Sequence, residues 1–299
     1  MDSKEREKMR VTSFTSTILE NLFLALPSLR NQHAPGSKVY ALLKQVARKE
    51  IEGLFSDHGA QVREFKPFGE LIFPYHKMGA IDSLNLFDLD ELIIFSFYWF
   101  NRKRYRRVAD VGANIGLHSI ILSRCGYEEI HAHEPDPELF KILQRNLSLN
   151  GCSGVQPFNT AVSNRTGTHE FTRVLGNLTG SHLTGSKLNP YGELDRFLVR
   201  IEDIKPIVEW ADLIKLDVEG HEKEVLLATN RDHWLNTDAL VEVENENNAA
   251  SIYEHFRNLG VRLFSQKINW QIVRDVDDMP TSYHEGTLFV TCKSEIPWQ

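Results

Sequence analysis

The segment that most restricts the fold of this chain is residues 108–116, with the sequence VADVGANIG. Its first residues suit a buried strand, glycine follows at positions 112 and 116, and a helical pattern continues over residues 117–124. Because glycine has no Cβ, the backbone at Gly112 and Gly116 can turn tightly and lie directly against a ligand. The segment therefore predicts the first strand of an α/β sheet, with a nucleoside-cofactor site at its carboxyl end.

After this segment, short apolar runs alternate with stretches of helical periodicity, which is typical of βαβ units and a mostly parallel sheet. One helix is predicted with clear ends, because Asp136 is an N-cap, Pro137 suits the first helical position and Gly151 follows the last turn. Residues 163–200 are rich in Thr, Gly, Asn and Ser and predict a hairpin and a long loop near the site. We expect strands over residues 107–111, 129–133, 155–159, 213–216, 240–244 and 287–292.

The first third of the chain has a different pattern, which predicts an α+β extension over residues 1–104. Apolar residues at every fourth position predict a helix over residues 12–26, and Ser37 suits the N-cap of a second helix that ends at Phe55. We expect the second helix to bury a stripe consisting of Val39, Leu42, Leu43, Val46, Ile51 and Leu54. The apolar residues 92–100 form a run of nine where a membrane span needs about 20, so they predict a buried helix, and we expect no transmembrane segment.

Charge and cysteine content narrow the partners and the compartment. The formal net charge is −7, which gives no general attraction to nucleic acid. The three cysteines, Cys125, Cys152 and Cys292, have no spacing typical of a disulfide framework or a metal site. No signal peptide is evident, so we expect a cytoplasmic protein. Because of the net charge we expect no nucleic-acid partner, and a homo-oligomer is compatible with the sequence.

The glycine turn favours a cofactor without a pyrophosphate. A dinucleotide fingerprint requires G-x-G-x-x-G, whereas this turn has Asn114 in place of the middle glycine. Glu134 ends the second expected strand, where doubly wound folds place the carboxylate that accepts hydrogen bonds from ribose hydroxyls. A solvated loop carboxylate is the alternative interpretation of Glu134.

Four ordered stretches resemble the FkbM family of S-adenosylmethionine-dependent methyltransferases: VADVGANIGLHS, EPDPELFKILQRNLSLNG, NTAVSNRTG and ADLIKLDVEGHEKEVL. The resemblance spans roughly residues 108–246. It implies a Rossmann-like class I methyltransferase fold, with a mostly parallel seven-stranded sheet and helices on both faces, over residues 105–299. The extension would then act as a cap that contributes to the acceptor site.

The same resemblance assigns cofactor contacts and an activity. Glu134 would hold the ribose, and residues 159–162, with Thr160 and Ala161, would meet the adenine edge. The implied activity is O-methylation of a hydroxyl on a sugar, glycan or related small molecule. Alternatives are N-methylation of a peptide or amine, a nicotinamide-dependent oxidoreductase on the same fold, and a cofactor-binding scaffold without chemistry. The residues expected around the methionine part of the cofactor are Asp110, Gly112, Asn114 and Gly116, with Asp217 close by.

Residues 217–221 (DVEGH) end a central strand beside the expected sulfonium. An alcohol is a poor nucleophile while protonated, so we interpret His221 as the general base and Asp217 as the residue that orients the acceptor or the cofactor. Other interpretations are open: His221 as a helix-terminal residue that hydrogen-bonds a neighbour, and Asp217 as an N-cap. Glu219 and Glu222 are expected to be first-turn carboxylates that the helix dipole stabilises.

Two further charged clusters have alternative interpretations. Glu244 and Asn245, with Asp217 opposite, suit an all-oxygen Mg²⁺ site, but the family pattern does not require a metal and we assign no metal ligand. Residues 102–107 (RKRYRR) are interpreted as a solvated face or linker, with a phosphate or anionic-lipid contact as the alternative.

Overall fold

The computed structural model describes residues 16–55, 61–79, 81–187 and 192–298, and its centre is an eight-stranded sheet. The strand order is β15-β14-β16-β13-β12-β5-β6-β7. The neighbours from β13 to β7 are parallel, and β16 runs antiparallel to both β13 and β14. The strands are β5 (Arg107–Val111), β6 (Glu129–His133), β7 (Val155–Phe158), β12 (Leu213–Leu216), β13 (Asp238–Val241), β14 (Arg262–Ser265), β15 (Gln271–Ile272) and β16 (Leu288–Thr291).

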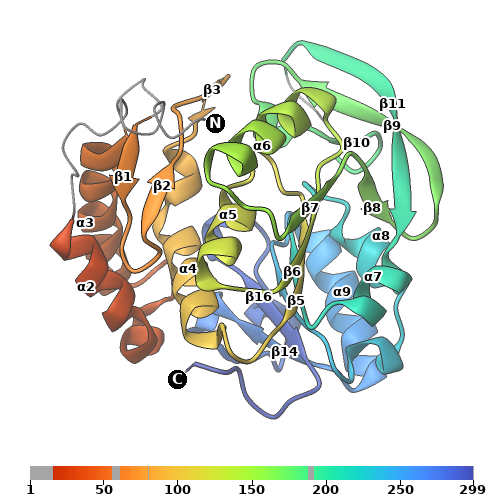
Figure 1. Ribbon diagram of the computed structural model, residues 1–299. Helices are drawn as coiled ribbons and strands as arrows, with labels where there is room; N and C mark the ends of the chain where they lie inside the picture. Colours follow the sequence, from red (N-terminus) through yellow and green to blue (C-terminus); the bar gives the residue numbers. More distant parts are fainter. Residues whose placement is uncertain (1–15, 56–60, 80, 188–191, 299) are drawn as a thin grey trace.

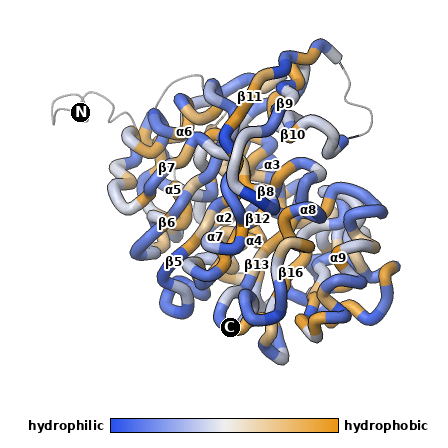
Figure 2. Tube along the Cα trace, turned by 90° about the vertical axis from the view of Figure 1, so that its right-hand side faces the viewer, coloured by the Kyte–Doolittle hydropathy of each residue, from blue (hydrophilic) through white to orange (hydrophobic). Residues whose placement is uncertain are grey.

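Helices cover both faces of this sheet (Figure 1). Alternate strand residues enter two separate cores: Leu213 and Leu240 face one, Ile214 and Val241 the other. Figure 2 shows hydrophobic residues along the central strands and hydrophilic residues on the outer turns. The first core is covered by α4 (Leu89–Asn101), α5 (Leu117–Cys125) and α6 (Pro137–Leu149), and the second by α7 (Ile204–Trp210), α8 (Glu222–Leu226) and α9 (Glu246–Leu259).

The direction of strand addition reverses between β5 and β12. From β5 the chain builds outward through β6 and β7, then crosses back to add β12 and β13 on the other side. Open α/β sheets bind ligands at such a switch point, outside the carboxyl ends of the strands. The expected Rossmann-like doubly wound sheet with helices on both faces is therefore confirmed.

The N-terminal third packs into the first core rather than forming a separate one. Its helices share one continuous apolar cluster with the main sheet, which includes Phe23, Ile51 and Phe95 together with Leu213. The boundary expected at residue 104 falls between α4 and β5. The elements before α4 are α2 (Thr17–Ala25), α3 (Lys38–Phe55), β1 (Val62–Glu64), β2 (Glu70–Ile72), β3 (Lys77–Met78) and β4 (Ile81–Asp82).

A smaller sheet of order β10-β9-β11-β8 is inserted between β7 and α7 and lies beside the carboxyl ends of the main strands (Figure 1). The long pairing of β9 with β11 is the hairpin expected in residues 163–200, of which residues 188–191 lie outside the described part. Its strands are β8 (Ala161–Ser163), β9 (Gly167–Val174), β10 (His182–Leu183) and β11 (Leu194–Asp203).

Several expected boundaries agree with the structure and others shift. The strands expected at 107–111, 129–133 and 213–216 have those bounds, and Asp136 caps α6 by accepting the backbone N–H of Glu138 at 2.8 Å. The strand expected at 240–244 begins two residues earlier, at Asp238. The sheet has eight strands rather than seven, because the two-residue strand β15 extends the edge beyond β14. The sequence pattern did not identify β14.

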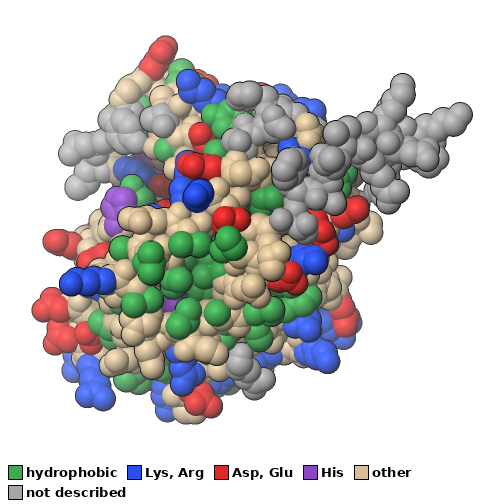
Figure 3. All heavy atoms as spheres, turned by 90° about the vertical axis from the view of Figure 1, so that its left-hand side faces the viewer, with side chains coloured by type: hydrophobic (Ala, Val, Ile, Leu, Met, Phe, Trp, Pro, Cys, Tyr) green, Lys and Arg blue, Asp and Glu red, His purple; other side chains and the backbone are tan. Residues whose placement is uncertain are grey.

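The buried face of α3 differs from the expected stripe. Ser37 caps the helix through the backbone N–H of Tyr40, as expected, and Ile51 and Leu54 are buried. Leu42, however, is 61% exposed and Val39 39% exposed, because Tyr40 and Ala47 supply the inner face instead. Figure 3 shows hydrophobic side chains gathered on this outer face of the molecule. The part of the first expected helix before Ser16 lies outside the described residues.

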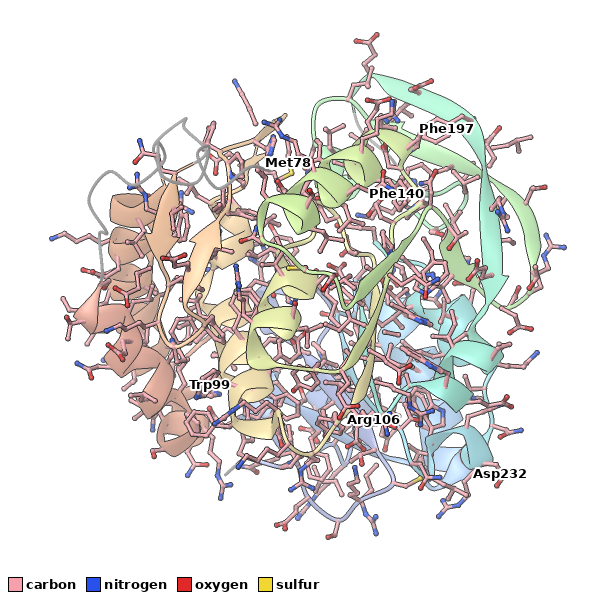
Figure 4. The ribbon with its side chains drawn as sticks, in the orientation of Figure 1. Met78, Trp99, Arg106, Phe140, Phe197 and Asp232 are labelled. Carbon is pink, nitrogen blue, oxygen red and sulfur yellow. The ribbon has the colours of Figure 1, made fainter. Side chains whose placement is uncertain are left out.

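The basic cluster at residues 102–107 lies at the amino end of β5, on the opposite edge from the glycine turn. In Figure 4 Arg106 is at the lower end, far from Phe140 and Phe197 at the upper end. Arg106 pairs with Glu128 at 2.6 Å, and Arg107 pairs with Asp212 at 3.0 Å. The cluster therefore makes surface ion pairs away from the switch point. Within the described residues, no helix has the length and apolarity needed to cross a membrane.

His33 joins the N-terminal third to the far edge of the sheet through two hydrogen bonds. Its Nδ1 accepts from Trp270 Nε1 at 2.9 Å, and its Nε2 donates to Leu26 O at 3.0 Å. The side chain is fully buried, and burial lowers the pKa of His33 from 6.5 to about 4. Both ring nitrogens are satisfied only in the neutral form, since protonated Nδ1 would meet the N–H of Trp270.

We predict that Gly112→Ala destabilises the protein by about 3 kcal/mol and that Gly126→Ala costs about 1 kcal/mol. Both glycines have a positive φ, 83° and 85°, so alanine is strained at either position. A Cβ at residue 112 would lie 1.7 Å from the backbone oxygen of Asp217, whereas at residue 126 it would meet nothing within 4 Å. Urea unfolding of both variants measures the difference, and equal losses would contradict the close approach at residue 112.

We also predict a pH dependence of stability from His33. Because its folded pKa lies below the unfolded value, its contribution is fully present above pH 6.5 and is lost as the pH falls toward 4. At about 1.36 kcal/mol per pH unit, the loss is about 3 kcal/mol. His33→Phe removes this titration, so the free energies of unfolding of wild type and variant, measured by urea unfolding from pH 7 to pH 4, should converge. Parallel curves would contradict the assignment.

Candidate functional site

The glycine turn at residues 112–116 satisfies all of its own backbone donors. The N–H groups of Gly112 and Ala113 donate to His133 O at 3.0 and 2.9 Å. The N–H of Asn114 donates to Glu134 Oε2 at 2.9 Å, and that of Ile115 to Asn114 Oδ1 at 2.8 Å. The N–H of Gly116 donates to Ala113 O at 2.8 Å. A pyrophosphate site needs free N–H donors at this turn, so the geometry disfavours a dinucleotide and fits a phosphate-free cofactor.

The turn lies directly against the end of β12. Gly112 is in contact with the backbone oxygen of Asp217, which occupies the space of a Cβ. Lys215 ties the two segments together, because its Nζ lies 3.0 Å from Asp217 Oδ2 and 3.3 Å from Gly112 O. Burial alone would lower the pKa of Lys215, but Asp217 and Asp110 outweigh burial and raise it. The ammonium therefore stays charged and holds Asp217 beside the turn.

Glu134 is fixed by two backbone donors. Its Oε2 accepts from Asn114 N, and its Oε1 accepts from Asp136 N at 2.8 Å. Each oxygen keeps a second lone pair, which is what a ribose diol requires. Burial raises the pKa of Glu134 to about 8, against the effect of these N–H groups. The side chain is 5% exposed, so it is a wall of the site and not the solvated loop carboxylate considered as an alternative.

A cavity of about 590 Å³, open solvent included, joins these groups. Seven of the nine predicted site residues line it: Gly112, Asn114, Glu134, Thr160, Ala161, Asp217 and His221.

Asp110 and Gly116 do not line the cavity. Asp110 is fully buried beneath the turn, where its Oδ2 accepts from the hydroxyl of Ser119. Gly116 is the N-cap of α5, and a Cβ there would lie 2.5 Å from Leu143 Cδ1. Both residues therefore support the turn from behind.

His221 lies at the start of α8 and is 8% exposed. Its Nε2 is 2.9 Å from Ser163 Oγ, and its Nδ1 is 3.0 Å from Ser186 Oγ. Burial lowers the pKa of His221 from 6.5, so the imidazole is neutral near pH 7, as a general base must be. The ring is helix-terminal and hydrogen-bonded, as in the alternative interpretation, and it also lines the cavity. Its role as a general base stays a prediction.

Glu219 and Glu222 differ from each other, although both were expected in a first helical turn. Glu222 is there: its Oε1 accepts from Gly220 N at 2.9 Å, and it is 1% exposed. Glu219 instead lies in the turn before the helix, with a φ of 54°. Its carboxylate pairs with Lys187, and burial together with Asp217 raises its pKa. The helix-dipole expectation for Glu219 is therefore wrong.

The Mg²⁺ interpretation finds no support at the end of β13. Glu244 Oε1 lies 2.9 Å from Lys187 Nζ, and the Asn245 side chain caps α9 by accepting from Asn248 N at 2.9 Å. Asp217 is paired with Lys215. Among the described residues, no group of three His, Cys, Asp or Glu side chains is arranged to hold a metal ion.

The sequence did not reveal the wall contributed by the inserted sheet. Phe171, Leu183 and Ser181 line the cavity opposite the main sheet. Arg173 on β9 fixes this wall to the main domain, because its Nε and Nη2 donate to the Asp136 carboxylate at 2.6 and 2.7 Å. The Thr- and Gly-rich composition predicted a loop near the site. It could not predict the ion pair of Arg173 with Asp136, because a contact between distant residues leaves no pattern in the local sequence.

Comparisons with known proteins agree with this geometry. A family model described as Methyltransferase FkbM domain matches residues 110–263, more than half of the chain. Methyltransferase sdnD of Sordaria araneosa is 32% identical over 159 residues, covering 42% of this chain and 61% of that protein. Methyltransferase 1 of Beauveria bassiana is 25% identical over 148 residues, covering 42% and 59%. The chain thus spans about three fifths of the length of the curated relatives it matches.

Solved structures that match this chain include the O-methyltransferase TomG of Streptomyces achromogenes in complex with SAM. It is 10% identical with a TM-score of 0.33, and the match covers 66% of this chain and 78% of that chain. The strand order, the glycine turn and the match over residues 110–263 together lead to one assignment. This chain belongs to the FkbM methyltransferase family.

Proposed function

We propose that this protein transfers the methyl group of S-adenosylmethionine to a hydroxyl of a sugar, glycan or related small molecule. The observation that carries the proposal is the glycine turn, whose five N–H donors are all bonded to other groups of the protein, one of them the buried carboxylate of Glu134. That arrangement suits an adenosine with a free ribose diol and no phosphate. The three free cysteines fit the reducing cytoplasm that we expect as its compartment.

The residues present fit the cofactor at both ends. Glu134 would accept the ribose hydroxyls, and Thr160 and Ala161 would border the adenine. Asp217 and the glycine turn would border the methionine part. When bound, the cofactor supplies an electrophilic methyl group on a sulfonium. Asp217 and Asp110, the carboxylates that act most on Lys215, would also favour a positively charged sulfonium at this end.

The chain's own chemical task is to position a hydroxyl and remove its proton. His221 is neutral, lies in the cavity wall and is the residue that we propose as the base. Asp217, held by Lys215, would orient the acceptor or the cofactor. Holding the acceptor oxygen in line with the methyl group supplies much of the rate, because it removes the entropy cost of the encounter.

We predict that S-adenosylhomocysteine binds more tightly as the pH rises through about 8. Burial sets the pKa of Glu134 there, and only the ionised carboxylate offers both oxygens as acceptors for the ribose diol. Glu134→Gln should lose about ten-fold in affinity or more and abolish the pH dependence, because one backbone N–H also loses its acceptor. Titration calorimetry from pH 7 to pH 9 measures both effects.

Glu138→Gln is the matched control for this experiment, since Glu138 lies near Glu134 in sequence but its side chain is 59% exposed and pairs with Lys141. A pH-independent affinity in the wild type would contradict the role of Glu134. The absence of any binding heat with well-folded protein would remove the proposed function itself.

A screen for the acceptor tests the reaction directly. Nucleotide sugars, glycans, small alcohols and amines are incubated with the protein and S-adenosylmethionine, and products gaining a methyl group are detected by mass spectrometry. We expect methyl ethers of hydroxyl compounds. Methylation only of amines, or loss of activity with a chelator, would contradict the O-methyl, metal-free proposal.

With the acceptor in hand, we predict that His221→Ala lowers kcat about 100-fold, the usual contribution of a general base. Affinity for S-adenosylhomocysteine should change far less. Because burial lowers the pKa of His221, the wild-type kcat/KM should fall only below pH 6.5, and this acid limb should disappear in the variant. His284→Ala, at an exposed histidine, is the control. Undiminished turnover of His221→Ala would exclude it as the base.

A further inference from the structure

Both ring nitrogens of His221 are already occupied by serine hydroxyls. Ser163 Oγ lies 2.9 Å from Nε2, and Ser186 Oγ lies 3.0 Å from Nδ1. A neutral imidazole has one N–H and one lone pair, so the two serines take up both. If His221 is the base of the proposed function, the acceptor hydroxyl can reach it only when one serine gives way.

The two serines differ in how firmly they are held. Ser163 is 4% exposed and belongs to β8, where its backbone pairs in register with Asp203 of β11. Ser186 belongs to the connecting segment Thr184 to Lys187, which follows β10 and is outside any strand. Displacing Ser163 would break a sheet, whereas displacing Ser186 moves a connection. Ser186, and with it Nδ1, is therefore the exchangeable side of the ring.

Lys187 fastens this segment over the site. Its Nζ pairs with Glu219 on one side and with Glu244 Oε1 at 2.9 Å on the other, so one ammonium joins the ends of β12 and β13. The Ser186 backbone also lies close to Gly220, since a Cβ there would be 3.0 Å from Ser186 O. The segment buries no apolar side chain, so polar contacts alone hold it over the site.

The chemical identity of the occupying group indicates what replaces it. Ser186 presents an aliphatic hydroxyl to Nδ1, the same group that an alcohol or sugar acceptor would present. Glu224 Oε2 lies 3.9 Å from Nδ1, where its negative charge stabilises a proton arriving on that nitrogen. Ser163 then has the complementary role, because it must accept the N–H of Nε2 while Nδ1 keeps its lone pair.

We propose that Ser186 occupies, on Nδ1 of His221, the position of the acceptor hydroxyl, and that the segment Thr184 to Lys187 is a latch that the acceptor displaces. This inference rests on the proposed function. In the step that follows, the acceptor oxygen bonds the methyl carbon and passes its proton to Nδ1. The carbon–sulfur bond breaks with its electron pair on sulfur, and the imidazolium later releases its proton to water.

The first test measures the tautomer of His221 in the full chain labelled with ¹⁵N-histidine. Long-range ¹H–¹⁵N spectra at pH 8 should give the Nε2–H form in the wild type. Ser186→Ala should keep this form because Ser163 still accepts the N–H. An Nδ1–H tautomer in the wild type would overturn the proposal, since Nδ1 would then have no lone pair for a proton.

The second test measures access to Nδ1 with diethyl pyrocarbonate, which modifies unprotonated imidazoles. Mass spectrometry gives the rate at His221 relative to exposed His284 in the same sample. Ser186→Ala and Lys187→Met should each accelerate modification of His221 about five-fold, the effect of losing a hydrogen bond of ordinary strength. Lys205→Met, which removes another surface ion pair, should leave the rate unchanged.

Unchanged rates at His221 in both latch variants would overturn the latch. Calorimetry with S-adenosylhomocysteine on the same samples separates the two levels of the argument. If binding is retained and the modification rates are unchanged, only the latch proposal is contradicted. Lack of binding by the wild type ends the proposed function, whatever the modification rates are.

Discussion

The contact between the glycine turn and the end of β12 sets the geometry of the whole site. Gly112 leaves just enough room for the backbone oxygen of Asp217, and Lys215 bonds to both segments. These residues come from strands on either side of the switch point, so the contact aligns two halves of the sheet that are more than 100 residues apart in sequence. This alignment determines where the cavity lies and where Asp217 and His221 are placed in its wall.

Rigidity on one side of the cavity is matched by weaker attachment on the other. Every N–H donor of the turn is bonded to another group of the protein, and two N–H groups hold Glu134, so the side that we propose for the cofactor needs no rearrangement. The opposite wall consists of the inserted sheet and the segment before Lys187, held by ion pairs to Asp136, Glu219 and Glu244. Preorganisation is thus concentrated on the side that we propose for the cofactor, and weaker attachment on the side that we propose for the acceptor.

Sequence reasoning reached those parts of the molecule whose determinants are local. Alternating apolar runs gave the bounds of β5, β6 and β12, and capping chemistry gave those of α6. It missed β14, a four-residue strand that pairs with two-residue β15 on one side and with β16 on the other. It also placed Leu42 on the wrong face of α3, since periodicity defines a stripe but not which residues a partner covers. The serine contacts of His221 depend on pairing across 58 and 35 residues, which no local pattern encodes.

The apolar cluster that runs without interruption from Phe23 to Leu213 couples the folding of the N-terminal third to that of the main sheet. The N-terminal third has no separate hydrophobic core. Replacing it with the corresponding part of a relative would therefore leave one face of the main sheet poorly packed, unless the residues that contact it were replaced as well. Sequence changes that alter the cavity should therefore be tolerated best in surface turns and in the inserted hairpin. Exchange of the first hundred residues as a block should cause misfolding, whatever binding properties the new segment has.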